Sequence, residues 1–155
     1  MFNLVLYQPE IPPNTGNIIR LCANTGCRLH LIEPLGFDLG HSRLKRAGLD
    51  YHEFVGVELH GSYEDMLQSL DCPRVMAFST KGKAAHASAA YEPDDVLLFG
   101  PETRGLPKEI LDSLPAEQCL RVPMLPDQRS LNLSNAASVV VYEAWRQWGF
   151  AGAAL

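Results

Sequence analysis

The sequence predicts an α/β fold in which a parallel sheet is covered by helices on both faces. Apolar runs such as residues 75–79 and 96–99 continue without polar alternation, which is typical of strands buried on both faces. Amphipathic segments of helical period separate these runs, and alternating strands and helices indicate a layered parallel sheet. With 155 residues and 46% hydrophobic content, residues 1–155 are expected to form a single domain.

The first half of the chain contains three predicted strands, each followed by a loop and a helix. The strands are expected at residues 2–7, 29–32 and 54–59. In the helix predicted at residues 15–25, Asn14 is the candidate N-cap and Gly26 the residue that ends it. A short helix is expected within residues 42–49. Another is expected at residues 63–70, where Ser62 and Asp65 have the spacing of a capping box.

The second half continues the alternation. Strands are expected at residues 75–79, 96–99 and 120–122, and residues 80–88 are expected to form a loop. Pro107 is expected in the first turn of a short helix, because proline lacks the N–H that this position leaves unpaired. The last helix is the most strongly periodic segment of the chain, and Gly149 is expected to end it.

This last helix has two apolar sides. One side carries the spacing of a buried face, formed by Leu133, Ala137, Val140, Val141, Ala144 and Trp148. Val139 and Tyr142 lie on the other side, beside Glu143 and Arg146. A helix with two apolar sides is buried twice, either inside the domain or against a second copy of the chain.

Composition restricts the partners of the protein. The formal net charge of -5 gives no global sign of nucleic-acid binding, so any contact with phosphate requires a local basic patch. The start of the sequence lacks a basic leader, and no later apolar run is long enough to span a membrane. We expect a cytoplasmic protein with no membrane partner.

The cysteines and histidines give no sign of a metal site. Four cysteines and five histidines are dispersed without CxxC pairing or zinc-ligand spacing, so reduced core thiols and no metal are expected. No nucleophilic triad order and no glycine-rich phosphate loop stands out.

Three polar segments follow predicted strands and therefore share one edge of the sheet, where ligands bind in such folds. The first carries Asn14, Asn17 and Arg20. The second, GPETRG, frames Glu102 and Arg104 with glycines that allow close backbone approach. The third runs from Pro123 to a helix start where Ser130, Asn132, Ser134 and Asn135 can all act as caps.

Each segment also has a purely structural interpretation. Arg20 can extend to solvent from its apolar stretch, GPETRG can be an ordinary turn with a surface ion pair, and the Ser/Asn cluster can be simple capping. Four capping residues at one helix start favour a ligand site.

The three segments carry a family resemblance. NTGNIIR, LLFGPETRGLP and VPMLPDQRSLNLSNAASVVVYEAWRQ resemble the three motifs of the SPOUT superfamily of S-adenosylmethionine-dependent RNA methyltransferases. The likeness covers essentially the whole chain and is greatest to the TrmL-type members, which methylate the ribose 2'-OH of the tRNA wobble nucleotide, C34 or modified U34.

The resemblance implies properties that composition does not show. It implies a deep trefoil knot near the C-terminus, an obligate homodimer and S-adenosyl-L-methionine as methyl donor, with S-adenosyl-L-homocysteine as product. It also implies a tRNA anticodon loop as partner, with leucine isoacceptors as the expected tRNAs.

The resemblance further assigns site residues. The catalytic positions are Asn14, Arg20, Glu102, Ser130 and Asn132. The cofactor contacts are Phe78, Gly100, Val122, Leu125, Ser130 and Leu133. Val139 and Tyr142 are assigned to the dimer. For RNA docking, the candidates in or near loops are Arg43, Lys45, Arg46, Lys81, Lys83 and Arg129, although such charges are often only solvated surface.

The implied chemistry is an in-line displacement, in which the ribose oxygen attacks the sulfonium methyl and loses its proton. Because a guanidinium does not deprotonate in proteins, Arg20 is interpreted as binding the 2'-oxygen or an adjacent phosphate rather than as a base. Two alternatives remain, a non-catalytic RNA-binding member of the family and a methyltransferase acting on another tRNA position or on rRNA.

Overall fold

The computed structural model describes residues 1–40 and 56–154. In this part of the chain seven strands form one sheet, in the order β3-β2-β1-β6-β4-β7-β5, and every pairing is parallel. The strands are β1 Asn3–Tyr7, β2 Arg28–Ile32, β3 Val57–His60, β4 Val75–Phe78, β5 Ala84–Ala85, β6 Val96–Phe99 and β7 Cys119–Arg121. The predicted fold class is therefore confirmed.

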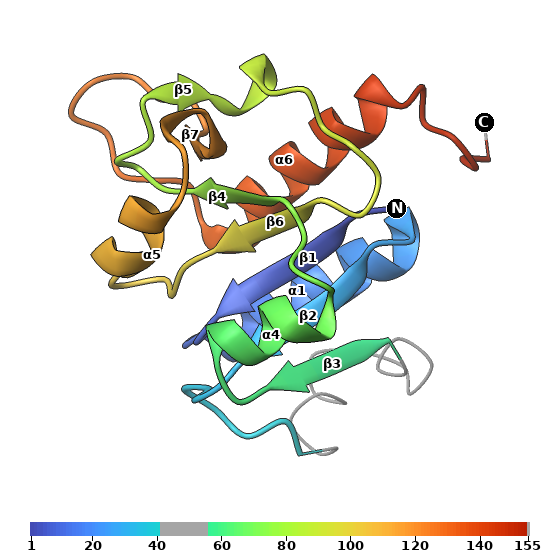
Figure 1. The fold of residues 1–155 in the computed structure, drawn as a ribbon, viewed down its shortest axis with the longest axis vertical. Helices are drawn as coiled ribbons and strands as arrows, with labels where there is room; N and C mark the ends of the chain where they lie inside the picture. Colours follow the sequence, from blue (N-terminus) through green and yellow to red (C-terminus); the bar gives the residue numbers. More distant parts are fainter. Residues whose placement is uncertain (41–55, 155) are drawn as a thin grey trace.

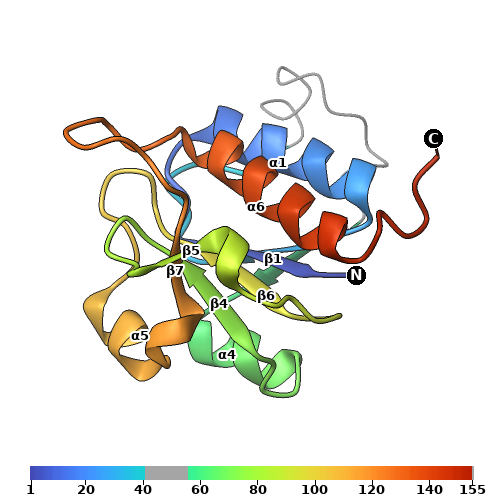
Figure 2. The same ribbon diagram turned by 90° about the horizontal axis from the view of Figure 1, so that it is seen from above.

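Helices cover both faces of the sheet, as Figures 1 and 2 show. The long helices α1 Pro12–Thr25 and α6 Leu133–Gln147 lie side by side on one face, and the short helices α4 Tyr63–Ser69 and α5 Lys108–Ser113 lie on the other. Two 3-10 turns, η1 His86–Ser88 and η2 Ala116–Gln118, complete the described elements. No helix in the described ranges is long and apolar enough to cross a membrane.

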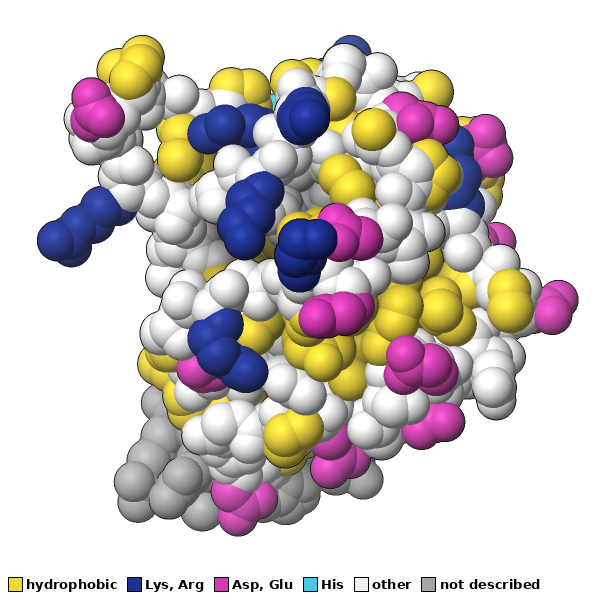
Figure 3. Space-filling model, turned by 60° about the vertical axis from the view of Figure 1, so that its left-hand side comes forward, with side chains coloured by type: hydrophobic (Ala, Val, Ile, Leu, Met, Phe, Trp, Pro, Cys, Tyr) yellow, Lys and Arg dark blue, Asp and Glu magenta, His cyan; other side chains and the backbone are white. Residues whose placement is uncertain are grey.

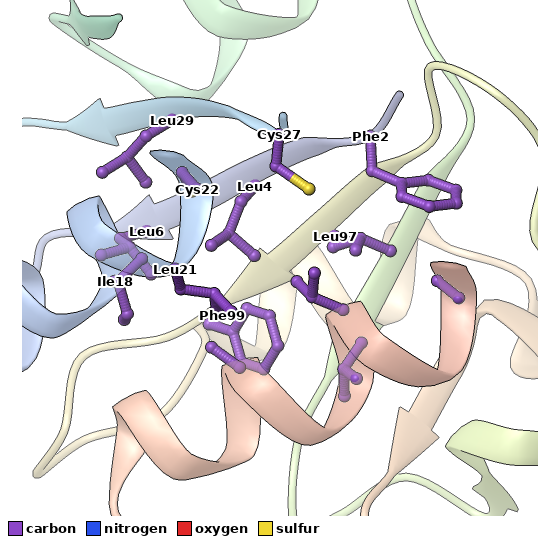
Figure 4. Close-up of a cluster of buried hydrophobic side chains, with 14 of the residues drawn as sticks. Phe2, Leu4, Leu6, Ile18, Leu21, Cys22, Cys27, Leu29, Leu97 and Phe99 are labelled. Atoms are coloured by element: carbon purple, nitrogen blue, oxygen red, sulfur yellow. The ribbon is translucent and has the colours of Figure 1, made fainter. Parts of the chain in front are cut away.

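The core divides into two layers because successive side chains of a strand point to opposite faces. Leu4 and Leu6 of β1 join the cluster beneath α1 and α6, whereas Val5 joins the cluster beneath α4 and α5. Figure 4 shows the first cluster, in which Ile18 and Leu21 of α1 meet the strand side chains. Burying one such side chain contributes about 1.5–3 kcal/mol, so these layers fix the sheet against its helices.

The first helix begins earlier than predicted. Its N-cap is Ile11, which makes no side-chain capping bond, and Pro12 and Pro13 occupy the first turn. Asn14 therefore lies inside the helix and is buried, so its assignment as N-cap is wrong. The prolines explain the shift, because the first turn leaves its N–H groups unpaired and proline has none. Gly26 ends the helix in a left-handed conformation, with φ of 74°, as predicted.

The last helix also differs in detail. The sequence predicts Trp148 on the buried face, but Trp148 is 45% exposed and lies just beyond α6, whereas Trp145 is 8% exposed and joins the core. Trp145 lies four residues after Val141 and so continues the buried stripe by one turn. The Trp148 indole N–H instead donates to the backbone oxygen of Tyr91 at 2.9 Å. Gly149 follows in a left-handed conformation.

Other local predictions have mixed outcomes. The Ser62 hydroxyl accepts the Asp65 N–H at 3.0 Å, which confirms that cap. Pro107 is the N-cap of α5 rather than a residue of its first turn. Cys22 and Cys27 are buried free thiols as expected, but Cys72 is exposed. The helix predicted within residues 42–49 lies outside the described residues.

The connection from β4 to β5 crosses the carboxyl end of β7. The Ser79 N–H donates to the Leu120 oxygen at 2.9 Å. A Cβ on Gly82 would lie 2.4 Å from Leu120 backbone atoms, so only glycine allows this approach. The two-residue strand β5 was predicted as loop, because two alanines give no apolar run. It forms by parallel pairing with β7.

Candidate active site

Three loops meet at the carboxyl edge of the sheet, together with the N-termini of α1 and α6. They are the segments after β4, β6 and β7, and Figure 2 shows them on the same side of the molecule as the starts of both long helices. This confirms the predicted common edge. Phe78, Gly100 and Val122 end or follow the three neighbouring strands β4, β6 and β7, so the expected cofactor contacts lie next to one another.

The loop after β6 is a tight ring. The Gly105 N–H donates to the Pro101 oxygen at 3.0 Å, and Gly105 has a φ of 68°. A Cβ on Gly100 would lie 2.4 Å from the Leu106 nitrogen and 2.5 Å from the Gly105 carbonyl carbon. These are backbone atoms that cannot move aside, so the ring closes only with glycine at position 100.

Glu102 projects from this ring onto the start of α1. Its carboxylate accepts the Glu10 N–H at 2.7 Å, the Ile11 N–H at 3.0 Å and the Asn14 side-chain N–H at 3.3 Å. Helix α1 has no side-chain cap of its own, so a carboxylate from a distant loop caps it. The observed role of Glu102 is therefore to fix the loop against the helix.

Asn132 joins the third segment to this arrangement. Its side-chain N–H donates to the Asn14 side-chain oxygen at 2.8 Å, while its own oxygen accepts the Ser134 N–H at 2.9 Å and caps α6. Asn132, Asn14 and Glu102 thus form one chain of hydrogen bonds linking the starts of both long helices to the β6 loop. The structure brings together these three predicted residues.

A second carboxylate crosses between the same two loops in the opposite direction. Glu10 accepts the Thr103 N–H at 3.0 Å and the Thr103 hydroxyl at 2.8 Å. These bonds, the backbone N–H first, lower the pKa of Glu10. The Arg104 guanidinium also donates to the Gln8 side-chain oxygen at 3.3 Å. We call residues 8–14 and 100–105, held by Glu102 and Glu10, the clasp.

Glu10 and Thr103 were not found by sequence reasoning. They are 93 positions apart, and no local period or cap pattern links them. Only their placement after neighbouring strands β1 and β6 could have suggested a contact.

Arg20 and Ser130 are the other two predicted catalytic residues. Arg20 is exposed on α1, six residues after Asn14, which is about 9 Å along the helix axis. Ser130 is exposed in the segment that precedes α6. Their assigned roles in catalysis and cofactor binding stay predictions.

The apolar side chains among the expected cofactor contacts differ in burial. The rings of Phe78 and Phe99 stack with centroids 4.9 Å apart. Val122 and Leu133 are partly buried against the core, whereas Leu125 is 76% exposed. Apolar surface next to a few polar groups suits a ligand with a flat ring and a polar tail.

Residues 123–131 form a projecting segment. Among the described residues their side chains make no hydrogen bond or ion pair, although Ser130 and Arg129 are polar. A cavity of about 450 Å³ lies against this segment, and Lys83 and Arg121 line it. Arg121 was missed as a basic candidate because it belongs to a predicted strand.

Basic side chains are frequent on this side of the molecule, and Figure 3 shows several of them close together. Lys81, Lys83 and Arg129 are exposed in the loops of this edge, as predicted. Arg43, Lys45 and Arg46 lie outside the described residues. Val139 and Tyr142 are exposed on α6, which is compatible with the dimer prediction but does not test it.

The histidines are less dispersed in space than in sequence. His30 and His60 are buried with their Nδ1 and Nε2 atoms 3.0 Å apart, and Glu58 lies 3.7 Å from His30. Burial lowers the pKa of His30 to about 4, so this ring is neutral near pH 7. The His30 Nε2 is also within 3.2 Å of the Asn3 side-chain oxygen. The absence of a metal stays an expectation.

Comparisons with known proteins give the family of the chain. Residues 1–142 match the model of the SpoU rRNA Methylase family. A tRNA (cytidine(34)-2'-O)-methyltransferase from Escherichia coli strain K12 is 64% identical over 155 residues, covering 100% of this chain and 99% of that protein.

Solved structures are similar along most of the chain. One, described as giving insights into the 2-OH methylation of C/U34 on tRNA, has 50% identity and a TM-score of 0.88, with 97% of each chain covered. An AdoMet-bound rRNA methyltransferase from Sinorhizobium meliloti has 25% identity and a TM-score of 0.80, over 94% of this chain and 56% of that one.

Proposed function

Because the chain belongs to the SpoU rRNA Methylase family, we propose that it methylates the ribose 2'-OH of nucleotide 34 of tRNA, C34 or modified U34. The methyl donor is S-adenosyl-L-methionine, and the product of the donor is S-adenosyl-L-homocysteine. The observation that carries the proposal is the 64% identity, from end to end, to a tRNA (cytidine(34)-2'-O)-methyltransferase. The clasp supports it, because Asn14, Glu102 and Asn132 converge from three distant segments.

The residues at the carboxyl edge fit the methyl donor. Phe78, Gly100 and Val122 stand at the ends of three adjacent strands, where backbone groups and apolar side chains can hold an adenosine. When bound, S-adenosylmethionine supplies a methyl group already activated on a sulfonium sulfur. The ribose O–CH3 bond forms as the S–CH3 bond breaks, and the 2'-OH proton leaves to phosphate or water.

The task left to the protein is to position the ribose oxygen. The clasp fixes α1 against the β6 loop, and α1 carries Arg20. In this proposal Arg20 binds the 2'-oxygen or an adjacent phosphate and stabilises the negative charge that develops there. Its guanidinium stays protonated throughout, so it takes no proton.

Substitution of Arg20 tests this role. Arg20→Ala is expected to lower kcat by about 100-fold or more, as loss of one donor to a developing oxyanion does, and Arg20→Lys to recover part of it. The measurement is single-turnover methylation across a range of pH. Similar turnover in both variants and the parent enzyme would rule out this role.

The function itself is tested by mapping the product. The protein is incubated with labelled methyl donor and unmethylated tRNA, leucine isoacceptors included, and the modified nucleoside is located by mass spectrometry. A 2'-O-methyl group at position 34 is expected. Methylation of rRNA alone, or at another tRNA position, would contradict the proposal, and cofactor binding without any methylation would favour a non-catalytic role.

Basic residues of the same edge are proposed to dock the anticodon loop. Lys81 and Arg129 are exposed there, and among the described residues neither has an ion-pair partner. The rest of the predicted set is Lys83, Arg43, Lys45 and Arg46. Since phosphate contacts release counterions, the affinity for tRNA should fall steeply as salt is raised. An affinity that is unchanged between about 50 and about 200 mM salt would argue against docking.

The remaining proposals concern assembly and topology. A homodimer through Val139 and Tyr142 is supported by their exposure on α6, and sedimentation of Tyr142→Arg should show more monomer than the parent. A trefoil knot is supported by the β4–β5 connection that crosses β7. A cytoplasmic location follows from a tRNA substrate.

A further inference from the structure

Two carboxylates link the same pair of loops in opposite directions. Glu102 leaves the β6 loop and accepts N–H groups of Glu10 and Ile11, at 2.7 and 3.0 Å. Glu10 leaves the β1 loop and accepts both the N–H and the hydroxyl of Thr103, at 3.0 and 2.8 Å. The backbone and the side chain of Glu10 therefore both belong to the contact.

Capping alone does not account for Glu10. Glu102 already receives the N–H groups at the start of α1, and one carboxylate is enough for a helix cap. A second carboxylate beside the first adds repulsion between like charges, which the Thr103 donors offset. The Thr103 bonds are also exposed to solvent, so their contribution to stability is small.

The bonds of Glu10 instead determine where the tip of the β6 loop lies. Thr103 is in the middle of the ring closed by the bond between Gly105 and Pro101, and the ring is packed against Gly100. Holding Thr103 therefore holds Gly100. The other end of the contact is the start of α1, the helix that carries Arg20.

We propose that Glu10 is a positioning residue for methyl transfer, an inference that rests on the proposed function. Through Thr103 it keeps the cofactor side of the site, at Gly100, aligned with the RNA side of the site, on α1. Glu10 touches neither reacting group. Small displacements of a positioned group are enough to slow a reaction of this kind by large factors.

The test compares Glu10→Ala, Glu10→Gln and Thr103→Val. At saturating tRNA and methyl donor, Glu10→Ala is expected to lower kcat about 10-fold, because the loop tip is no longer held. Glu10→Gln keeps an acceptor oxygen at the same reach and should recover most of this loss. Thr103→Val keeps the backbone donor and should lie between them. The double variant Glu10→Ala/Thr103→Val should be no slower than Glu10→Ala, since both remove one interaction.

A matched control separates positioning from folding. Glu117→Gln removes an exposed carboxylate in η2 and should leave kcat and the urea midpoint unchanged. Calorimetric affinity for S-adenosylhomocysteine is measured for each variant, and Glu10→Ala should bind it several-fold more weakly than Glu10→Gln. If the parent binds this ligand but methylates no tRNA, the proposed function fails and the affinities still test Glu10. A folded Glu10→Ala variant with the kcat and affinity of the parent would overturn the inference. If Glu10→Ala does not fold, the same two measurements on Thr103→Val test the inference instead.

Discussion

The clasp and the 123–131 segment occupy the same edge of the sheet but are held in different ways. Glu102 and Glu10 cross-link residues 8–14 and 100–105 with charge-assisted hydrogen bonds, and Asn14 extends them to α6. The 123–131 segment projects from the body with Leu125 76% exposed, and within the described residues its side chains make no hydrogen bond. One side of the site is preformed, and the other has the surface of a region that a ligand or second chain completes.

This difference matches two separate requirements of the proposed reaction, accurate placement of the ribose oxygen and exchange of the ligands. Methyl transfer needs an accurately placed oxygen, and preformed polar contacts supply that accuracy at no cost during the reaction. Donor and RNA must also enter and leave, which a weakly held segment permits. Substitutions in the clasp should therefore lower kcat, with or without weaker binding, whereas substitutions in the segment should weaken binding and leave kcat nearly unchanged.

The largest effect is expected for Gly100→Ala. The added Cβ meets backbone atoms of Leu106 and Gly105 at 2.4 and 2.5 Å, so the ring must open. We expect turnover to fall by about 100-fold or more and the free energy of unfolding to fall by about 1–3 kcal/mol. Single-turnover assays and urea unfolding measure these changes.

Gly56→Ala is the matched control for that substitution. A Cβ at Gly56 meets none of the described residues within 4 Å, so activity and stability should stay near the parent values. An active, stable Gly100→Ala enzyme would show that the clasp side is not preformed.

Glu102→Gln is expected to have the next largest effect. The carboxylate of Glu102 accepts from three N–H donors, whereas the glutamine amide of the same shape has only one accepting oxygen. Its NH2 group therefore faces at least one N–H donor, and α1 loses part of its cap. We expect kcat to fall about 10-fold and the free energy of unfolding to fall by about 1 kcal/mol. If Glu102 only positions groups, the pH profile of kcat keeps its shape; loss of one ionisation from the profile would make it a proton acceptor.

Leu125→Ser tests the other side of the comparison and should have the smallest effect. Leu125 is largely exposed, so the free energy of unfolding should change by less than about 0.5 kcal/mol. KM for S-adenosylmethionine should rise several-fold while kcat is nearly unchanged. Leu131→Ser, in the same segment but outside the predicted cofactor contacts, serves as control. A fall in kcat with unchanged KM would place Leu125 with the clasp residues.

The sequence predicted the elements that have a strong local cause. The strand β6 was predicted to the residue, because an uninterrupted apolar run follows a charged turn and precedes Gly100. The starts of helices were less predictable. Asn14 has the chemistry of a cap, but Pro12 and Pro13 begin α1 before it, and its amide serves a contact to Asn132 across the molecule.

Hydrogen bonds between polar residues far apart in the chain could not be predicted from the sequence pattern. Glu102 and Asn132 were assigned through family resemblance, and their actual partners became visible only in the structure. Glu10 and Arg121 carry no periodic signal, and the motif that contains Thr103 does not reveal its partner, since these contacts depend on which strands are neighbours in the sheet. The buried pair of His30 and His60 was missed for the same reason.

Amide hydrogen exchange with and without S-adenosylhomocysteine tests the division of the site most directly. The amides of Glu10, Ile11 and Thr103 donate to carboxylates, so they should exchange slowly in the free protein and change little on binding. Amides of residues 123–131 should exchange fast in the free protein and slow by about 10-fold or more when ligand saturates the site. Equal protection of both regions without ligand, or protection gained in the clasp alone, would contradict the account.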